Sequence, residues 1–147
     1  MDVSGSESIF VTGHKTGDIR LWSTNQMKVM HTIEKVHQEK VECCVFSRDE
    51  KKIYSVSRDH TIKVTDMQTL KQITAMEHQD LIIPSGGCKF GLSANGKFLA
   101  VGGQNGQVFV FNLETHKIEE IYAGEHSAPV LGCQWDPNWG SRLATID

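Results

Sequence analysis

The sequence lacks any long apolar run. No stretch approaches the roughly 18 consecutive apolar residues that a membrane-spanning helix requires, so we expect no direct insertion into a bilayer. The polar start from Met1 to Ser8 also lacks a basic segment followed by an apolar stretch, which is the pattern of a secretory signal. These absences predict a soluble, cytoplasmic chain.

The sequence also lacks an excess of positive charge. Its 15 Lys and Arg residues are outnumbered by 18 Asp and Glu residues, which gives a formal net charge of −3. A protein that binds a nucleic-acid backbone needs clustered basic residues to replace the counterions of the phosphates. The charge balance therefore predicts no nucleic-acid partner.

Motifs for metals and cofactors are missing as well. The four cysteines and seven histidines show neither the Cys-x-x-Cys nor the His-x-x-x-His spacing of a zinc site. The glycine-rich run from Gly102 to Gly106 lacks the Gly-Lys-Ser or Gly-Lys-Thr of a phosphate loop. We predict no bound metal and no cofactor, and we expect Cys44 and Cys133 to act as small apolar core residues.

What the sequence does contain is a repeat. Trp22, Thr65 and Phe111 occupy the same position in three similar segments, 43 and 46 residues apart. Aliphatic residues stand one and three positions before each of them, and a lysine stands six positions after each. The alternation predicts a β-strand, and a period near 40 to 45 residues is typical of a four-stranded propeller blade.

The repeat predicts an all-β fold made of propeller blades. Two segments, approximately 36–77 and 78–124, contain the pattern of all four strands, whereas approximately 1–35 and 125–147 contain only part of it. Thirteen strands are expected, with exposed edges at 9–12 and 142–146. Because unpaired strand edges readily pair with other strands, we expect self-association or completion by blades from the rest of a longer chain.

One segment carries a more specific motif. His37 is followed by the turn Ser57-Arg58-Asp59 and by a strand that ends at Thr65-Asp66. This arrangement resembles a WD40 repeat, in which an opening His, a Ser or Thr, a turn Asp and a Trp are hydrogen-bonded in series. The resemblance implies a structural network of His37, Ser55, Asp59 and Thr65, where Thr65 replaces the usual indole.

A nucleophilic triad is the alternative reading of His37, Ser55 and Asp59. It would require an oxyanion site and a concave pocket, and nothing in the sequence indicates either. An enzyme or sensor built around a propeller's central channel would need converging His or carboxylate side chains on the inner strands, which are mainly apolar here. We therefore predict no catalytic residues and a protein that is not an enzyme.

The order of motifs also resembles the last blades of the C-terminal propeller of autophagy-related protein 16. This closer resemblance rests on the order of Ile19 to Trp22, Tyr54 to Asp59 with Lys63 to Asp66, a blade entered by an enlarged loop, Glu125 to Ser127 and Cys133 to Pro137. It implies a WD40 scaffold that helps recruit the LC3-type lipidation machinery to autophagic or endolysosomal membranes. A WD40 scaffold of another assembly, cytoskeletal, signalling or ubiquitin ligase, is the alternative.

One segment breaks the repeat by an insertion. From the opening His to the last apolar residue of the first strand the count is nine in two segments, but it is fourteen from His78 to Leu92. The extra residues include Leu81, Ile82 and Ile83, apolar side chains where a polar turn is usual. Such a loop either covers a blade edge or contacts a protein partner.

Partner contacts are expected through the loops of one propeller face. The resemblance implies that this face carries the insertion and the turns that follow the second strand of each blade. Lys40 matches a lysine that opens the same strand in the family, whereas Lys15 replaces an aromatic residue found there. The candidate contacts are Lys15, Lys40, Arg58, Leu81, Ile82, Ile83 and Gln104.

Overall fold

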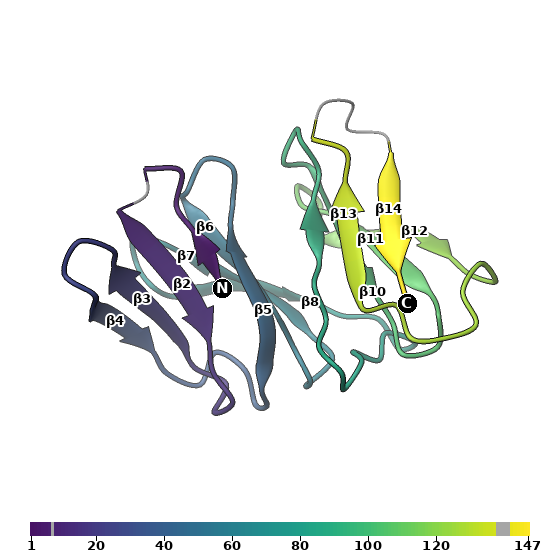
Figure 1. Cartoon of the computed structure of the whole chain (residues 1–147), viewed down its shortest axis with the longest axis horizontal. Helices are drawn as coiled ribbons and strands as arrows, with labels where there is room; N and C mark the ends of the chain where they lie inside the picture. Colours follow the sequence, from purple (N-terminus) through teal and green to yellow (C-terminus); the bar gives the residue numbers. More distant parts are fainter. Residues whose placement is uncertain (7, 138–141) are drawn as a thin grey trace. The chain divides into compact units, whose positions relative to one another are not determined.

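The computed structural model describes residues 1–6, 8–137 and 142–147, which form strands and connecting turns (Figure 1). They divide into two compact units, residues 1–75 and 76–147, each of which is described by itself. Within the described ranges no helix is long and apolar enough to cross a membrane. The all-β prediction is confirmed by four antiparallel sheets with four, four, four and two strands.

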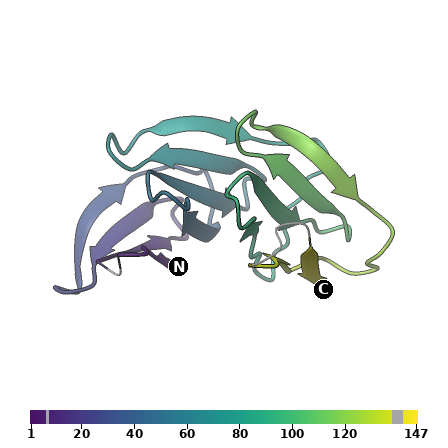
Figure 2. The same cartoon turned by 90° about the horizontal axis from the view of Figure 1, so that it is seen from above.

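The first sheet has one strand more than the sequence predicted. It contains β1 (Asp2–Val3), β2 (Ile9–Gly13), β3 (Ile19–Ser23) and β4 (Lys28–Ile33), in that spatial order. In Figure 2 this sheet runs from purple near the N-terminus to the blue β4. We expected this segment to begin with β2, but Asp2 and Val3 pair with Val11 and Phe10. Two residues are too short to show a period, so the sequence pattern could not reveal β1.

The second sheet follows the predicted four-strand pattern. It contains β5 (Val41–Phe46), β6 (Lys52–Ser57), β7 (Ile62–Asp66) and β8 (Gln72–Met76) in sequence order. The third sheet contains β9 (Gly91–Leu92), β10 (Phe98–Gly102), β11 (Val108–Asn112) and β12 (Lys117–Tyr122). The fourth pairs β13 (Gly132–Trp135) with β14 (Leu143–Ile146).

Each unit has its own apolar core because the alternating strands turn one row of side chains inward. In the first unit, aliphatic residues of the first sheet pack against residues of the second. In the second unit, residues of β10 and β11 pack against Val130, Cys133 and Trp135. Cys44 and Cys133 lie in these cores, and burial raises the pKa of each thiol to about 12. Both therefore remain protonated near neutral pH and act as apolar residues.

The turn after the third strand recurs in three sheets. In each sheet the residue five positions after Trp22, Thr65 or Phe111 has a positive φ, between 52° and 57°. These residues are Met27, Leu70 and His116. The turn begins at Ser23, Asp66 or Asn112, whose side-chain oxygen accepts backbone N–H groups of the turn. Such side-chain acceptors favour a turn over continued strand, which explains the polar residue at this position.

A glycine fixes the turn between the second and third strands in two of the sheets. Gly17 and Gly106 have φ of +83° and +77°, a backbone region that L side chains rarely adopt. A Cβ at Gly17 would lie 2.0 Å from the carbonyl oxygen of His37, and one at Gly106 would lie 2.5 Å from that of His126. Each glycine thus lets a turn pack directly against the His that opens the next sheet.

Candidate functional site

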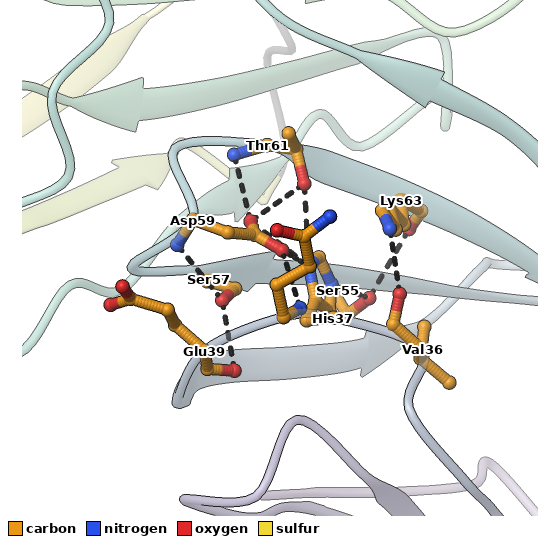
Figure 3. A network of polar contacts seen from close by, with 9 residues as sticks. Val36, His37, Glu39, Ser55, Ser57, Asp59, Thr61 and Lys63 are labelled. Carbon is orange, nitrogen blue, oxygen red and sulfur yellow. Dashed lines mark hydrogen bonds and ion pairs between the residues drawn. The ribbon is translucent and has the colours of Figure 1, made fainter.

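The hydrogen-bonded network predicted for the second sheet is centred on His37. This residue lies between β4 and β5, and its backbone N–H donates to the carbonyl of Gly17 at 3.0 Å. Its ring spans the space between two partners (Figure 3): Nδ1 lies 2.9 Å from Asp59 Oδ2, and Nε2 lies 2.8 Å from Ser55 Oγ. The structure therefore brings together three of the four predicted members.

The partners determine which ring nitrogen of His37 carries the proton. A carboxylate can only accept, so the Nδ1–H donates to Asp59 and Nε2 accepts the hydroxyl of Ser55. Burial lowers the pKa of His37, and it outweighs the opposing attraction of Asp59. The imidazole is therefore neutral near pH 7, with both nitrogens satisfied.

Asp59 links the ring to the turn that follows β6. Its carboxylate accepts from the hydroxyl of Thr61 at 2.7 Å and from the backbone N–H of Gln38 at 3.0 Å. Burial by itself would raise the pKa of Asp59, but these hydrogen bonds and the contact with His37 outweigh it, so the pKa lies below its usual value. The carboxylate is thus ionised and joins two loops.

Thr65, the fourth predicted member, does not join this network. Its side chain is fully buried, and Oγ1 has no hydrogen-bond partner among the described residues. In the first sheet the indole of Trp22, at the same repeat position, reaches Thr12 Oγ1 at 2.8 Å. A threonine is too short to make that contact. Thr61 adds a hydrogen bond at the opposite end of the network, to Asp59, which its position in the turn could have suggested.

A related pair in the fourth sheet was missed in the sequence. His126 Nε2 lies 2.7 Å from Thr145 Oγ1, and its Nδ1 lies 3.4 Å from Asp147 Oδ2. His126 and Thr145 are 19 residues apart, and His37 and Ser55 are 18 residues apart, so this similar spacing could have revealed the pair from the sequence. The third sheet has no such pair at these positions, because Val101 stands where Ser55 does, and His78 packs on Phe109 with ring centroids 5.7 Å apart.

The order of bonds in Ser55, His37 and Asp59 matches that of a nucleophilic triad, but its surroundings differ. Ser55 is 0% exposed and His37 is 1% exposed, so the hydroxyl cannot meet a substrate from solution. The network instead satisfies buried polar groups and holds the opening loop to the blade. No three His, Cys, Asp or Glu side chains within the described ranges gather closely enough to hold a metal ion.

Two of the candidate partner contacts share an anchor in the first unit. Lys40 Nζ lies 2.9 Å from Glu42 Oε2, and the Nε of Arg58 donates to Oε1 of the same carboxylate. The Glu42 side chain is only 2% exposed, whereas Lys40 and Arg58 are partly exposed. Lys15 is exposed in the turn between β2 and β3. The buried carboxylate therefore fixes how both cations are presented at the surface.

The insertion divides into buried and exposed side chains. Leu81 and Ile83 are 1% and 4% exposed, whereas Ile82 between them is 45% exposed. The backbone N–H of Gln104 donates to the carbonyl of Ile82 at 2.7 Å, and the Gln104 side chain is exposed. Leu81 and Ile83 thus act as core residues in this structure, and their side chains are not available to a partner. Ile82 and Gln104 remain as surface candidates.

Comparison with known proteins supports the family resemblance. A family model described as "WD domain, G-beta repeat" matches residues 27–66, which include the His37 network. The chain is 24% identical over 141 residues to "Autophagic-related protein 16.2" of Caenorhabditis elegans, covering 95% of the chain and 26% of that protein. It is 27% identical over 136 residues to "Autophagy-related protein 16" of Arabidopsis thaliana, covering 92% of the chain and 26% of that protein.

A mammalian relative has a similar identity and coverage. The chain is 25% identical over 146 residues to "Protein Atg16l2" of Mus musculus, covering 99% of the chain and 23% of that protein. The chain thus spans about a quarter of the length of the relatives it matches. The sheets follow the pattern of WD40 blades, residues 27–66 match the WD40 family model, and the chain is similar over most of its length to autophagy-related protein 16.

Proposed function

We propose that this chain is a non-catalytic module of an autophagy-related protein 16-like scaffold. Its loops bind protein partners and so help to recruit the LC3-type lipidation machinery to autophagic or endolysosomal membranes. The lipid chemistry belongs to other chains. The names of the relatives support the link to autophagy, and the buried Ser55 hydroxyl supports a structural role for the triad-like arrangement of the second sheet.

The observation that carries this proposal is the fixed presentation of Ile82. The buried side chains of Leu81 and Ile83 anchor the loop on both sides, and the hydrogen bond from Gln104 holds the Ile82 carbonyl. An exposed aliphatic residue held in one conformation loses little entropy when a partner covers it. Fully burying an exposed aliphatic side chain is worth about 1.5 to 3 kcal/mol, and covering Ile82, which is 45% exposed, would be worth roughly half of that.

Substitution of Ile82 tests the proposal. Chain carrying Ile82→Ser is compared with wild type in its recovery of autophagic or endolysosomal membrane proteins and of the LC3-type conjugation machinery from cell extract. We expect Ile82→Ser to lose these proteins while its melting temperature stays unchanged. Ile73→Ser is the matched control, because Ile73 is 47% exposed on β8, and it should retain them.

Three results would contradict the proposal. If Ile82→Ser and Ile73→Ser recover the same partners as wild type, the loop is not the contact. If the partners that depend on Ile82 are components of the cytoskeleton, of a signalling complex or of a ubiquitin ligase, the chain serves another WD40 assembly. A fall in the melting temperature of Ile82→Ser with all partners retained would show that the loop only seals the blade.

A second contact surface is proposed for the first unit. Lys40 and Arg58 are presented by the Glu42 carboxylate, and Lys15 is exposed on a neighbouring turn.

We propose the blade boundaries as approximately 1–35, 36–77, 78–124 and 125–147; the bounds of the four sheets support this division.

A further inference from the structure

The first unit contains an apolar groove between its two sheets that the proposed function does not use. Its volume is about 200 Å³. Ile9, Leu21 and Met30 of the first sheet line one wall, and Met67 and Leu70 of the turn after β7 line the other. Met67 and Leu70 also pack against the apolar core of this unit. Both walls therefore belong to four-stranded sheets of one compact unit.

The groove can accept one aromatic side chain. Met30 lies on β4, the outermost strand of the first sheet (Figure 1), and is 48% exposed, so this wall is open to solution. Methionine side chains adapt to the shape of what they contact, and the sulfur atoms of Met30 and Met67 can make favourable contacts with an aromatic ring. An apolar cavity of about 150 Å³ is large enough for benzene.

The internal repeat shows that a blade does not need apolar or neutral residues at these positions. Met30 on β4 stands at the repeat position that Glu119 takes on β12. Gln68, which also lines the groove, stands at the position that Glu114 takes in the third sheet's turn. The third sheet forms with carboxylates at both positions. The absence of negative charge from the groove is therefore a property of these residues and not of the fold.

The glutamine at position 68 also leaves a lysine unpaired. In the third sheet Lys97 Nζ lies 3.5 Å from Glu114 Oε1. Lys51 is the counterpart of Lys97, and its carbonyl accepts the backbone N–H of Met67 at 2.9 Å, so it adjoins the groove's turn. Because Gln68 replaces the glutamate, no carboxylate among the described residues lies within 4 Å of the Lys51 ammonium.

The other charges around this turn add to the positive potential. Lys71 is exposed at the end of the turn, and its carbonyl accepts the backbone N–H of Asp66 at 2.9 Å. Its ammonium likewise forms no ion pair within the described ranges. The nearby carboxylates of Asp49, Glu50 and Asp66 each accept backbone N–H groups of turns. Lys51 and Lys71 therefore offer positive charge on both sides of the turn.

We propose that this groove binds a short acidic segment of a partner protein, whose single aromatic side chain enters between Leu21 and Met67. Carboxylates before and after the aromatic residue meet Lys51 and Lys71. Burial of the ring supplies most of the affinity, and the charges supply orientation and selectivity. This contact is separate from that of Ile82, which belongs to the second unit.

Methionine methyl groups report directly on the groove. The full chain, labelled with ¹³C at its methionine methyl groups, is titrated with the acetylated and amidated peptide Asp-Glu-Phe-Glu-Asp and followed by NMR. We expect saturable shifts of Met30 and Met67, because the phenyl ring lies beside them, and no shift of Met76, which is 2% exposed. A peptide with Ala in place of Phe should shift neither, and added salt should weaken binding of the acidic peptide.

Substitutions in the chain test the charges. Gln68→Glu gives Lys51 the partner that Lys97 has, so it should weaken binding of the acidic peptide about threefold or more. Glu114→Gln is the matched control in the third sheet and should bind as wild type does. Lys51→Glu combined with Lys71→Glu should reverse the preference, so that the peptide Lys-Lys-Phe-Lys-Lys binds better than the acidic one. Melting temperatures should stay unchanged, because these side chains are exposed.

The proposal is overturned by any of three results. One is the absence of Met30 and Met67 shifts at about 1 mM acidic peptide; if vesicles of phosphatidylcholine and phosphatidylserine shift them instead, the surface meets a lipid bilayer. Another is unchanged binding of the acidic peptide to folded Gln68→Glu or to the doubly reversed chain. The third is a shift of Met30 and Met67 with chain concentration alone, since a second copy would then fill the groove.

Discussion

The imidazole of His37 connects the opening segment of the second sheet to the turn after β6 and to β6 itself. His37 bonds Asp59 in the turn after β6 and Ser55 within β6, while Ser57 Oγ donates to the carbonyl of Glu39 nearby. Each of these groups is buried or partly buried, and an unsatisfied one would cost about 1 to 3 kcal/mol. The Thr65 hydroxyl shows the contrast, since it is buried at the indole position without a partner among the described residues.

The His37 network makes stability depend on pH. Burial holds the pKa of His37 below 6.5, so the unfolded chain binds a proton near that pH which the folded chain does not. Stability should therefore fall as the pH drops below about 6.5, by at most about 1.4 kcal/mol per pH unit for one proton. The lowered pKa of His14 acts with the same sign. The lowered pKa of Asp59 stabilises the folded chain at neutral pH, and this stabilisation is lost only as the pH falls below about 3.8.

Urea unfolding near pH 7 and near pH 5 measures this effect. We expect a lower midpoint at the acidic pH with an unchanged m value. His37→Gln is the control, because glutamine cannot titrate while it keeps a donor and an acceptor. Its difference between the two pH values should be smaller than that of wild type, and an equal difference would assign the effect to other groups.

At the scale of elements, the turn between the second and third strands of a sheet lies close to the segment that leads into the next sheet. Gly17 meets the carbonyl of His37, and Gly106 meets that of His126. His60 stands at the same position in the second sheet and has φ of 64°, so the left-handed conformation is kept there even without glycine. The left-handed turn conformation therefore recurs in all three sheets, and at Gly17 and Gly106 the turn also lies close to a His carbonyl.

Gly17→Ala should destabilise the chain for two reasons. An alanine at φ +83° costs about 1 to 2 kcal/mol. Its Cβ would also lie 2.0 Å from the His37 carbonyl, so the turn must move away from the opening segment. Gly124→Ala is the matched control, since Gly124 has φ of +93° and no described atom lies within 4 Å of the place its Cβ would take.

Chemical denaturation of both variants separates strain from contact. We expect Gly124→Ala to lose about 1 to 2 kcal/mol and Gly17→Ala to lose clearly more. A loss of similar size in the two variants would mean that the turn at Gly17 adjusts without cost and that the contact with His37 is not a constraint.

At the scale of the whole molecule, the repeat made the sheets predictable but not every contact. The alternating aliphatic residues before Trp22, Thr65 and Phe111 predicted the third strand of each sheet, because a period of two depends only on neighbouring residues. The burial of Leu81 and Ile83 depends on what packs over the insertion, which no local pattern encodes. The absence of Thr65 from the network and the addition of Thr61 depend on side-chain reach, and β1 is too short to show any period.

The exposed strand edge predicted at 142–146 has a counterpart in the structure. Within the described ranges β14 lacks a partner on one side, as expected, whereas the edge predicted at 9–12 is covered by β1. The tendency to self-associate stays a prediction.

The two units should differ in their response to a core substitution. Leu21 belongs to the core of the first unit and is almost fully buried, and a Leu→Ala change in such a place typically costs about 2 to 5 kcal/mol. In repeat proteins, stability is approximately a sum of terms from each repeat and its neighbours, so the loss should be greatest near the substitution. Leu21→Ala should therefore reduce hydrogen-exchange protection in β2, β3, β5 and β6 more than in β10, β11 and β13. Val108→Ala, which alters the equivalent core of the second unit, should give the reverse pattern. A uniform loss of protection across both units in either variant would show instead that the chain unfolds as one cooperative body, and that its two cores do not respond separately.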